Sequence, residues 1–286
     1  MIKKFFLLAT FLSFFCNSSF SEEYDFLGKI YYHPDSESSV QLTNDFVSFI
    51  WDNGSSIQKD GRKSKLLVTD GFTILSTNKE DFILLNISLN NNLNFISLIN
   101  NAEGEWGKRI YIPFYYSNNE QISSSPVLQP VKVVKTSSYL KEKMNGKNIE
   151  YYPINYDGAF HLYNLPWVVT NTNNWIEFLV TPQFEDYSTD YLEVSQLVIC
   201  NGYFYPGRLD LYKKNSRIKQ IKLVYGEIDF ITELKDIPGF QTINLPKSIN
   251  VNKDTNFKLF IQSIYPGDKY KDIALSAILF PTARLK

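Results

Sequence analysis

Histidine and cysteine, the side chains that most often carry metal or nucleophilic chemistry, are scarce in this sequence. His33 and His161 are the only histidines, and neither has a cysteine or glutamate at the spacing of a zinc site. Neither stands beside a Gly-x-Ser-x-Gly segment, and no glycine-rich phosphate loop is present. We therefore expect both histidines to be surface or partly buried residues, with no metal and no cofactor.

Paired carboxylates are a second possible chemistry, because two of them can supply the acid and base of glycoside hydrolysis. Glu185 with Asp186, Glu177 or Asp190 could form such a pair. All four lie in loop-like polar sequence, and a chain with 30 acidic residues contains similar pairs by chance. The sequence therefore disfavours a glycosidase.

Aromatic side chains near loop tips are better candidates for binding a ligand. The C–H faces of sugars stack on aromatic rings, and polar side chains hydrogen-bond the hydroxyl groups. An alternative for the tryptophans is a place in the core. The ligand-binding candidates are Trp167, Asn171, Asn173, Trp175, Tyr187, Tyr203, Tyr205 and Arg208.

The N-terminus has the pattern of a secretory signal. Lys3 and Lys4 precede an apolar run of about 11 residues, too short to span a membrane, and Ser19 and Ser21 suit cleavage before Glu22. We predict a signal peptide at 1–21 and export to the periplasm, the outer surface or the medium, with a lipoprotein signal at Cys16 as the less favoured alternative. The mature chain would then contain one thiol, Cys200, no intramolecular disulfide and no transmembrane segment.

The elements that must position these residues are predicted to be β-strands. Short apolar runs at 28–32, 46–51, 65–68, 82–87 and 109–114, separated by Asp-Gly and Asn-rich turns, predict a small sandwich or barrel over 22–121. A polar stretch then predicts a linker at 122–132. From 133 to 283, period-2 runs about 8–15 residues apart predict an antiparallel sandwich. The fold class is therefore all-β, with two domains.

The second half also contains an ordered set of short motifs. Asn145-Gly146 suits a hairpin turn, Asn201-Gly202 a strand-end turn, and Arg217 the bidentate pairing of a carboxylate such as Asp236 or Asp272. We expect these positions to be structural. The full set is Asn201, Gly202, Asn215, Arg217, Asp236, Gln241, Tyr265, Pro266, Gly267 and Asp272.

In order and spacing, this set resembles the NAD glycohydrolase translocation domain, also called the NADase-type glycan-binding domain. That family is a variant of the discoidin-like, coagulation-factor type C, galactose-binding-like jelly-roll sandwich. The resemblance implies loops at one end that bind glycans or other surface ligands, and no catalysis in this domain. The sequence departs from the family pattern at Asp157-Gly158 to Val169 and at 181–191, in the region where ligand-facing loops are expected.

The predicted function is thus that of an exported bacterial envelope protein, not an enzyme, whose second domain recognises a carbohydrate or a cell-surface or envelope protein. A net charge of −1 gives no reason to expect nucleic acid as a partner. One alternative is an exported hydrolase with its active site in the N-terminal domain, for which Glu103, Glu105 and Trp106 are the candidates. Another is an interaction protein without a small ligand.

Overall fold

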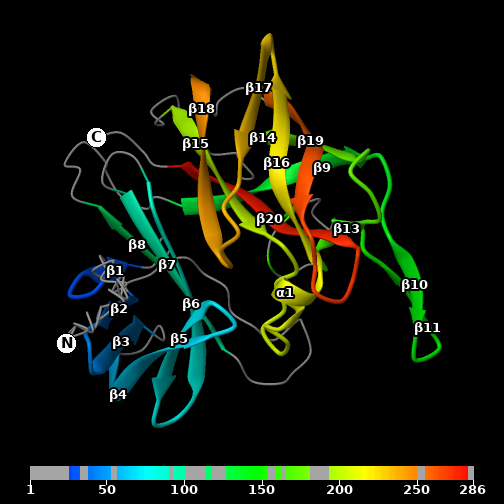
Figure 1. The fold of residues 1–286 in the computed structure, drawn as a ribbon. Helices are drawn as coiled ribbons and strands as arrows, with labels where there is room; N and C mark the ends of the chain where they lie inside the picture. The colour runs from blue at the N-terminus through cyan, green and yellow to red at the C-terminus, as the bar shows by residue number, and fades with distance from the viewer. Residues whose placement is uncertain are drawn as a thin grey trace, which may run out of the picture.

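The computed structural model describes residues 26–32, 38–52, 57–89, 93–100, 114–117, 127–153, 159–160, 162, 165–180, 193–249 and 255–282. The predicted signal peptide, Cys16, both histidines, Tyr187, the carboxylates Glu185, Asp186 and Asp190, and the N-terminal candidates Glu103, Glu105 and Trp106 lie outside these residues. The described chain is nearly all β, as the sequence predicted (Figure 1). No helix within these residues is long and apolar enough to cross a membrane.

The first part of the chain is a closed antiparallel barrel in which each strand pairs with the next and β8 pairs with β1 through Tyr32 and Tyr115. The first four predicted runs correspond to β1, β3, part of β4, and β6, while β2, β5 and β7 were not predicted. The run at 109–114 lies outside the described residues except for Phe114, where β8 begins. The strands are β1 (Ile30–Tyr32), β2 (Ser39–Leu42), β3 (Phe46–Asp52), β4 (Ile57–Thr69), β5 (Phe72–Thr77), β6 (Asp81–Ser88), β7 (Leu93–Asn100) and β8 (Phe114–Ser117).

Strand β6 shows why one barrel strand reads as a continuous apolar run. Leu84 packs inside the barrel with residues such as Val40 and Leu42. Ile83 and Leu85 point the other way, into a cluster shared with the second domain. Successive side chains of a strand alternate between its two faces, so a strand buried on both faces loses the usual apolar–polar alternation.

The second part of the chain is a β-sandwich with one short helix. The Asn145-Gly146 turn has positive φ at both positions and joins β10 to β11, so the predicted hairpin is confirmed. The elements are β9 (Val127–Thr136), β10 (Lys141–Met144), β11 (Lys147–Glu150), β12 (Ala159–Phe160), β13 (Trp167–Val169), β14 (Trp175–Val180), β15 (Val194–Asn201), α1 (Leu211–Lys214), β16 (Ser216–Tyr225), β17 (Ile228–Glu233), β18 (Phe240–Ile249), β19 (Thr255–Tyr265) and β20 (Ile273–Thr282).

Strands β9, β14, β19, β16 and β17 form one layer, and β13, β20, β15 and β18 form the other. Strand β9 belongs to both, because residues 127–130 pair with β20 and residues 132–136 with β14. It begins six residues before the predicted domain start at 133, within the segment predicted as a linker. Gln129 and Pro130 interrupt the apolar pattern there, although Gln129 is buried opposite Phe280.

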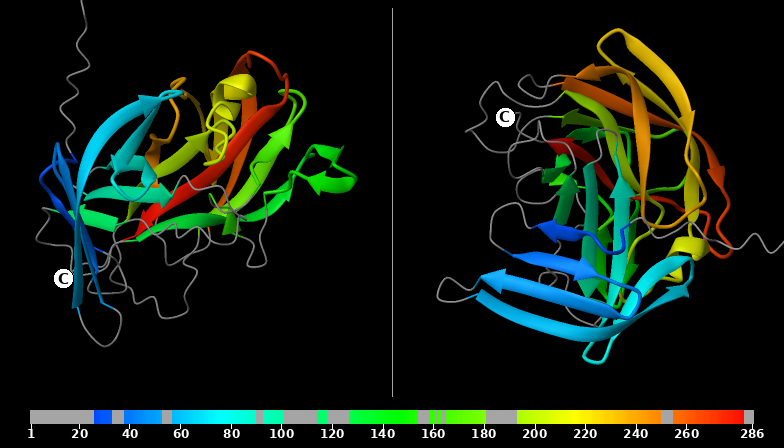
Figure 2. Two further views of the ribbon diagram at one scale, coloured as in Figure 1. Left: turned by 90° about the horizontal axis from the view of Figure 1, so that it is seen from below. Right: turned by 90° about the vertical axis from the view of Figure 1, so that its left-hand side faces the viewer.

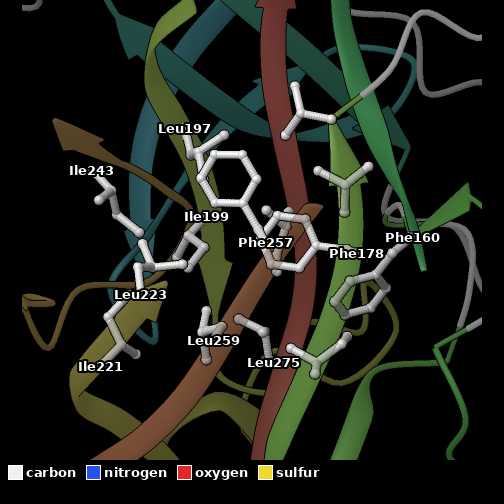
Figure 3. Packing of buried hydrophobic residues seen from close by; sticks show 14 of the residues in the cluster. Phe160, Phe178, Leu197, Ile199, Ile221, Leu223, Ile243, Phe257, Leu259 and Leu275 are labelled. Atoms are coloured by element: carbon white, nitrogen blue, oxygen red, sulfur yellow. The ribbon is translucent and has the colours of Figure 1, made fainter. Parts of the chain in front are cut away.

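Aromatic and branched side chains from both layers fill the space between them. Phe178 stacks on Phe257 at 5.4 Å between ring centroids, and Phe257 stacks on Tyr225 at 4.5 Å. Figure 3 shows these phenylalanines packed among Leu223, Leu259 and other residues of both layers. This core fixes the strand ends from which the loops project.

The barrel packs against the outer face of the β15–β20 layer (Figures 1 and 2). Phe72 of β5 lies 5.7 Å from the ring of Phe204 and 5.8 Å from that of Tyr212, measured between centroids. Cys200 is fully buried in the same cluster, and burial raises the pKa of its thiol. Cys200 forms no disulfide with any described residue.

Candidate functional site

Among the described residues, four loop segments of the sandwich meet at one end, which we call the loop end: residues 137–153, 170–174, 202–215 and 266–272. Strand pairing brings them together. Val169 at the end of β13 and Ser216 at the start of β16 both pair with Ile273, where β20 begins. Asn201 at the end of β15 pairs with Leu275. In Figure 1 this end lies at the bottom of the sandwich, around α1.

Arg217 is the structural centre of the loop end, as its motif predicted. Its Nε and Nη2 donate to the two carboxylate oxygens of Asp236 at 3.0 and 2.7 Å. Its Nη1 donates to the backbone carbonyls of Lys213, Asn215 and Pro266 at 3.0–3.2 Å. The side chain is 5% exposed. Arg217 therefore ties α1, the loop after β17 and the loop after β19 into one unit.

Asn201 and Gly202 perform a similar task beside it. The fully buried Asn201 donates to the carbonyl of Ile218 at 2.7 Å and accepts from the Ile218 amide at 3.1 Å. Gly202 has φ +79°, and a Cβ there would come within 2.8 Å of atoms of Tyr212 and Arg217. Only glycine fits this combination of backbone conformation and close packing.

The remaining motif positions mostly form local backbone contacts. Asn215 donates to the carbonyl of Leu211, Gln241 both donates to and accepts from the backbone of Lys235, and Tyr265 donates to the carbonyl of Leu234. A Cβ at Gly267 would lie 2.5 Å from three backbone atoms. Their geometry is structural, as the sequence indicated.

Trp167 is a core residue, which corrects the expectation that it contacts a ligand. It is 1% exposed, packs in the core of the sandwich, and donates from Nε1 to the carbonyl of Ser138 at 2.9 Å. Its place in β13, with both neighbours also buried, leaves no ring face for stacking. The alternative of a core tryptophan is therefore the observed one.

The polar candidates in two of the loops are largely held by the protein itself. The side-chain oxygen of Asn171 accepts from the Asn173 amide at 3.0 Å and from Asn174 at 2.9 Å. Arg208 makes a two-point contact with Asp210, with both distances 2.8 Å. Asn174, which the sequence did not single out, is buried and accepts from the hydroxyl groups of Ser137 and Ser138. Of these candidates, Asn173 has an exposed side chain with no described partner.

Tyrosines and carboxylates form the more open part of the loop end. Tyr203 and Tyr205 are half-buried. The ring of Tyr203 lies edge-on to Tyr151 at 6.2 Å, and the Tyr151 hydroxyl donates to Glu142 of the hairpin. Burial, and secondarily the charge of Glu142, raises the pKa of Asp272. Among the described residues no group donates a hydrogen bond to the Asp272 side chain, so two carboxylates lie here without a cation.

Trp175 begins β14 next to the loop end, where its backbone hydrogen-bonds Ser137, but its side chain lies on the outer face of the sheet. In β14 the inward residues are Ile176, Phe178 and Val180, and the half-buried Trp175 points outward. Lys258 of β19 holds its Nζ 3.6 Å from the ring centroid, and Lys135 of β9 lies 6.0 Å away. The alternation of apolar and polar residues in 175–180 could have indicated this orientation, but the lysines opposite depend on strand pairing.

Of the remaining candidates, Glu177 departs from its predicted position. Glu177 is not in a loop but in β14, where its carboxylate accepts from Asn256 at 2.8 Å. Tyr187 lies outside the described residues, between the end of β14 and the start of β15. The flanking residues Val180 and Val194 pair with Thr255 and Ile249, at the end of the sandwich opposite the loop end.

A cavity of about 520 Å³ lies between the two domains. Barrel residues of β5 and β6, including Phe72 and Asn86, form one wall, and the loop before β18, including Ile237 and Pro238, forms the other. Glu233 is the carboxylate in its lining. Within the described residues, no group of three or more His, Cys, Asp or Glu side chains could hold a metal ion.

The decisive comparison is with known families. The family described as "NAD glycohydrolase translocation F5/8 type C domain" matches residues 127–281, more than half of the chain. The chain belongs to this family. The resemblance read from the motifs is thus confirmed, as is the discoidin-like sandwich. The F5/8 type C domain is a binding or translocation module, and its range coincides with β9 to β20.

Other comparisons add little. No curated protein matches the chain. A solved structure, the GH31 α-xylosidase from Xanthomonas citri, is 9% identical, with 88% of this chain and 37% of that enzyme covered and a TM-score of 0.18. This chain therefore spans well under half of that enzyme's length. A likeness at this level carries no argument about the F5/8 type C domain or the barrel.

Proposed function

We propose that this protein is an exported, non-catalytic binding protein whose F5/8 type C domain recognises a carbohydrate at the loop end. The observation that carries the proposal is the open group of Tyr203, Tyr205, Glu142 and Asp272. Half-buried aromatic rings lie there beside two carboxylates for which the described residues provide no cationic partner. Aromatic faces suit sugar rings, and carboxylates accept hydrogen bonds from sugar hydroxyl groups.

The rigidity of the surrounding loops supports this use of the loop end. Arg217, Asn201 and Asn174 hold the loops with short hydrogen bonds from buried side chains. A binding surface whose groups are fixed beforehand loses less entropy when a ligand binds. Export is proposed from the leader pattern at 1–21, and a mature chain that begins at Glu22 by mass spectrometry would support it.

A glycan array probed with the full purified protein tests the proposal. We expect binding to neutral, hydroxyl-rich glycans, weakened about tenfold by Tyr205→Ala or by the Glu142→Gln, Asp272→Asn double variant, since each removes stacking or acceptor groups. Glu193→Gln, at the opposite end of the sandwich, is the matched control and should bind like the unchanged protein. A folded protein that binds no glycan, or equal binding by every variant, would overturn the proposal.

A further inference from the structure

The outer face of the β9–β14–β19 layer has a composition unlike that of the loop end. Trp175 pairs across the strands with Phe260 of β19, and both rings are half-buried on the same side of the sheet. Lys258 and Lys135 lie on the strands to either side of β14. We call Trp175, Phe260, Lys135 and Lys258 the aromatic–lysine face.

The two lysines of this face contact aromatic rings rather than carboxylates. The Lys258 ammonium lies 3.6 Å from the Trp175 centroid and 5.3 Å from that of Phe260. The Lys135 ammonium lies 6.0 Å from the Trp175 centroid. Within the described part of the chain, neither lysine forms an ion pair. An exposed cation–π contact is weak, so a bound anion can draw either ammonium from the ring.

Glu177, the nearest carboxylate on this strand, is turned away from the tryptophan. Its oxygen accepts from Asn256 at 2.8 Å. Asn256 pairs with Leu179, two residues further along β14 on the side away from Trp175. Glu177 is nevertheless the strand partner of both Lys258 and Lys135, so its carboxylate lies between them on the same face, although it forms no ion pair with either among the described residues. The two lysines and this carboxylate leave the face with a net charge of +1 beside the aromatic ring.

We propose that the aromatic–lysine face is a second binding site, for a uronate unit of an acidic polysaccharide. The C–H face of the pyranose ring stacks on Trp175, and its carboxylate takes the ammonium groups of Lys258 and Lys135 as partners. A flat sheet surface suits a polymer that passes over it. The site does not rest on the loop-end proposal, because it uses different side chains of opposite charge.

The charges of the two surfaces predict that they select different sugars. At the loop end, Glu142 and Asp272 repel an acidic unit, and the raised pKa of Asp272 reflects burial and the charge of Glu142. At the aromatic–lysine face, the two lysines outnumber the single carboxylate of Glu177, so a uronate meets a net positive charge. A mixed polymer with neutral and acidic units can therefore engage both surfaces at once.

The test is titration of the full protein with tetragalacturonate, with its methyl ester as the uncharged probe of the same ring structure. Tryptophan fluorescence and calorimetry report binding. We expect the acid to bind about tenfold more tightly than the ester, and less tightly as salt increases. Trp175→Ala should weaken binding of both probes about tenfold, and the Lys135→Met, Lys258→Met double variant should remove the preference for the acid.

The loop-end double variant Glu142→Gln, Asp272→Asn is the matched control and should bind tetragalacturonate like the unchanged protein. No binding of the acid, equal binding of acid and ester, or unchanged binding by Trp175→Ala would overturn the assignment. So would tighter, Trp175-dependent binding of an oligonucleotide, since that identifies a different class of polymer. Neutral glycans that still bind in those cases would leave the loop-end proposal standing.

Discussion

The loop end and the aromatic–lysine face belong to one sandwich, yet they treat their polar side chains in opposite ways. At the loop end, Arg217, Asn201 and Arg208 find their partners within the protein. On the sheet face, Lys135 and Lys258 have aromatic rings as their contacts. Polar side chains among the loops therefore mostly serve the structure of the protein, whereas the two lysines on the sheet face remain available to a ligand.

This contrast has a physical basis in the geometry of the two surfaces. Loops expose backbone N–H and C=O groups that strands would otherwise pair, so a compact group of loops needs polar side chains to satisfy them. The strands of a sheet pair their backbone groups with one another, so their outward side chains are not needed to satisfy backbone hydrogen bonds. Matched pairs of residues test the contrast, from the largest expected effect to the smallest.

The two tryptophans should differ most. Trp167→Ala removes a fully buried ring and its hydrogen bond to Ser138, and should lower the free energy of unfolding by about 4 kcal/mol. Trp175→Ala on the sheet face should lower it by less than about 1 kcal/mol. Urea denaturation followed by circular dichroism measures both, and comparable losses would show that Trp175 is also a core residue.

Two arginines at the loop end form the next pair. Arg217→Met removes the guanidinium from Asp236, which keeps the Tyr212 hydroxyl as a donor, and leaves the carbonyls of Asn215 and Pro266 without this donor. It should cost about 3 kcal/mol. Arg208→Met breaks an exposed pair with Asp210, and should cost at most about 1 kcal/mol. Thermal and urea unfolding of both variants at equal ionic strength provide the comparison. An Arg217 variant as stable as the Arg208 variant would contradict its central role.

Two asparagines give a smaller contrast. Asn201→Ala leaves the backbone of Ile218 without its side-chain partner inside the core, and we expect a loss of about 2 kcal/mol. Asn173→Ala, at an exposed loop position, should change stability by less than about 0.5 kcal/mol. Hydrogen exchange of the Ile218 amide would localise the effect, and unchanged protection in the Asn201 variant would be inconsistent with the bond.

Two carboxylates of the loop end should respond to pH in opposite senses. Burial raises the pKa of Asp236, but hydrogen bonds and charge from Arg217 outweigh it and hold the pKa below its ordinary value. Its stabilising contribution is present above the unfolded-state pKa and is lost as pH falls through the folded-state pKa. The pKa of Asp272 is raised, so the folded state favours its neutral, protonated form. Its contribution to stability is therefore fully present below the unfolded-state pKa and is lost as pH rises through the folded-state pKa.

Asp236→Asn should therefore destabilise the protein at neutral pH, whereas Asp272→Asn should stabilise it slightly. Both differences from the unchanged protein should shrink in acid, where the carboxyl groups become neutral. Unfolding midpoints in urea between about pH 2.5 and pH 7 follow both differences, around the ordinary aspartate pKa of about 3.9. Differences of the same sign would disprove the contrast between the two residues.

Much of the fold was accessible to sequence reasoning, and the failures share a cause. The sandwich strands alternate cleanly because one face is buried and the other exposed, so their class and order were predictable. Strands β2, β5 and β7 of the barrel were missed because short or Asn-bounded segments resemble turns. The start of β9 was missed because Pro130 and the buried Gln129 interrupt the apolar–polar alternation that indicates a strand.

The candidate site was harder to predict than the fold. The pairing of Arg217 with a carboxylate was expected, and Asp236 rather than Asp272 is its partner. Trp167 could not be distinguished from a surface tryptophan, since burial depends on the layer that covers it. The contact between Trp175 and Lys258 joins strands about 80 residues apart, and no local pattern predicts that pairing.

The sequence by itself determined the all-β class, the discoidin-like family and the structural role of most of its motif residues, with Asp272 as the exception. Those properties follow from local alternation, turn residues and ordered motifs, which neighbouring residues in the chain specify. Only the tertiary structure decided which aromatic rings are covered and which polar groups lack a partner. The covering of a ring and the pairing of a polar group both depend on the register of distant strands and on the packing of the barrel against the sandwich. Burial by residues far apart in the sequence, rather than local conformational preference, determines these two properties.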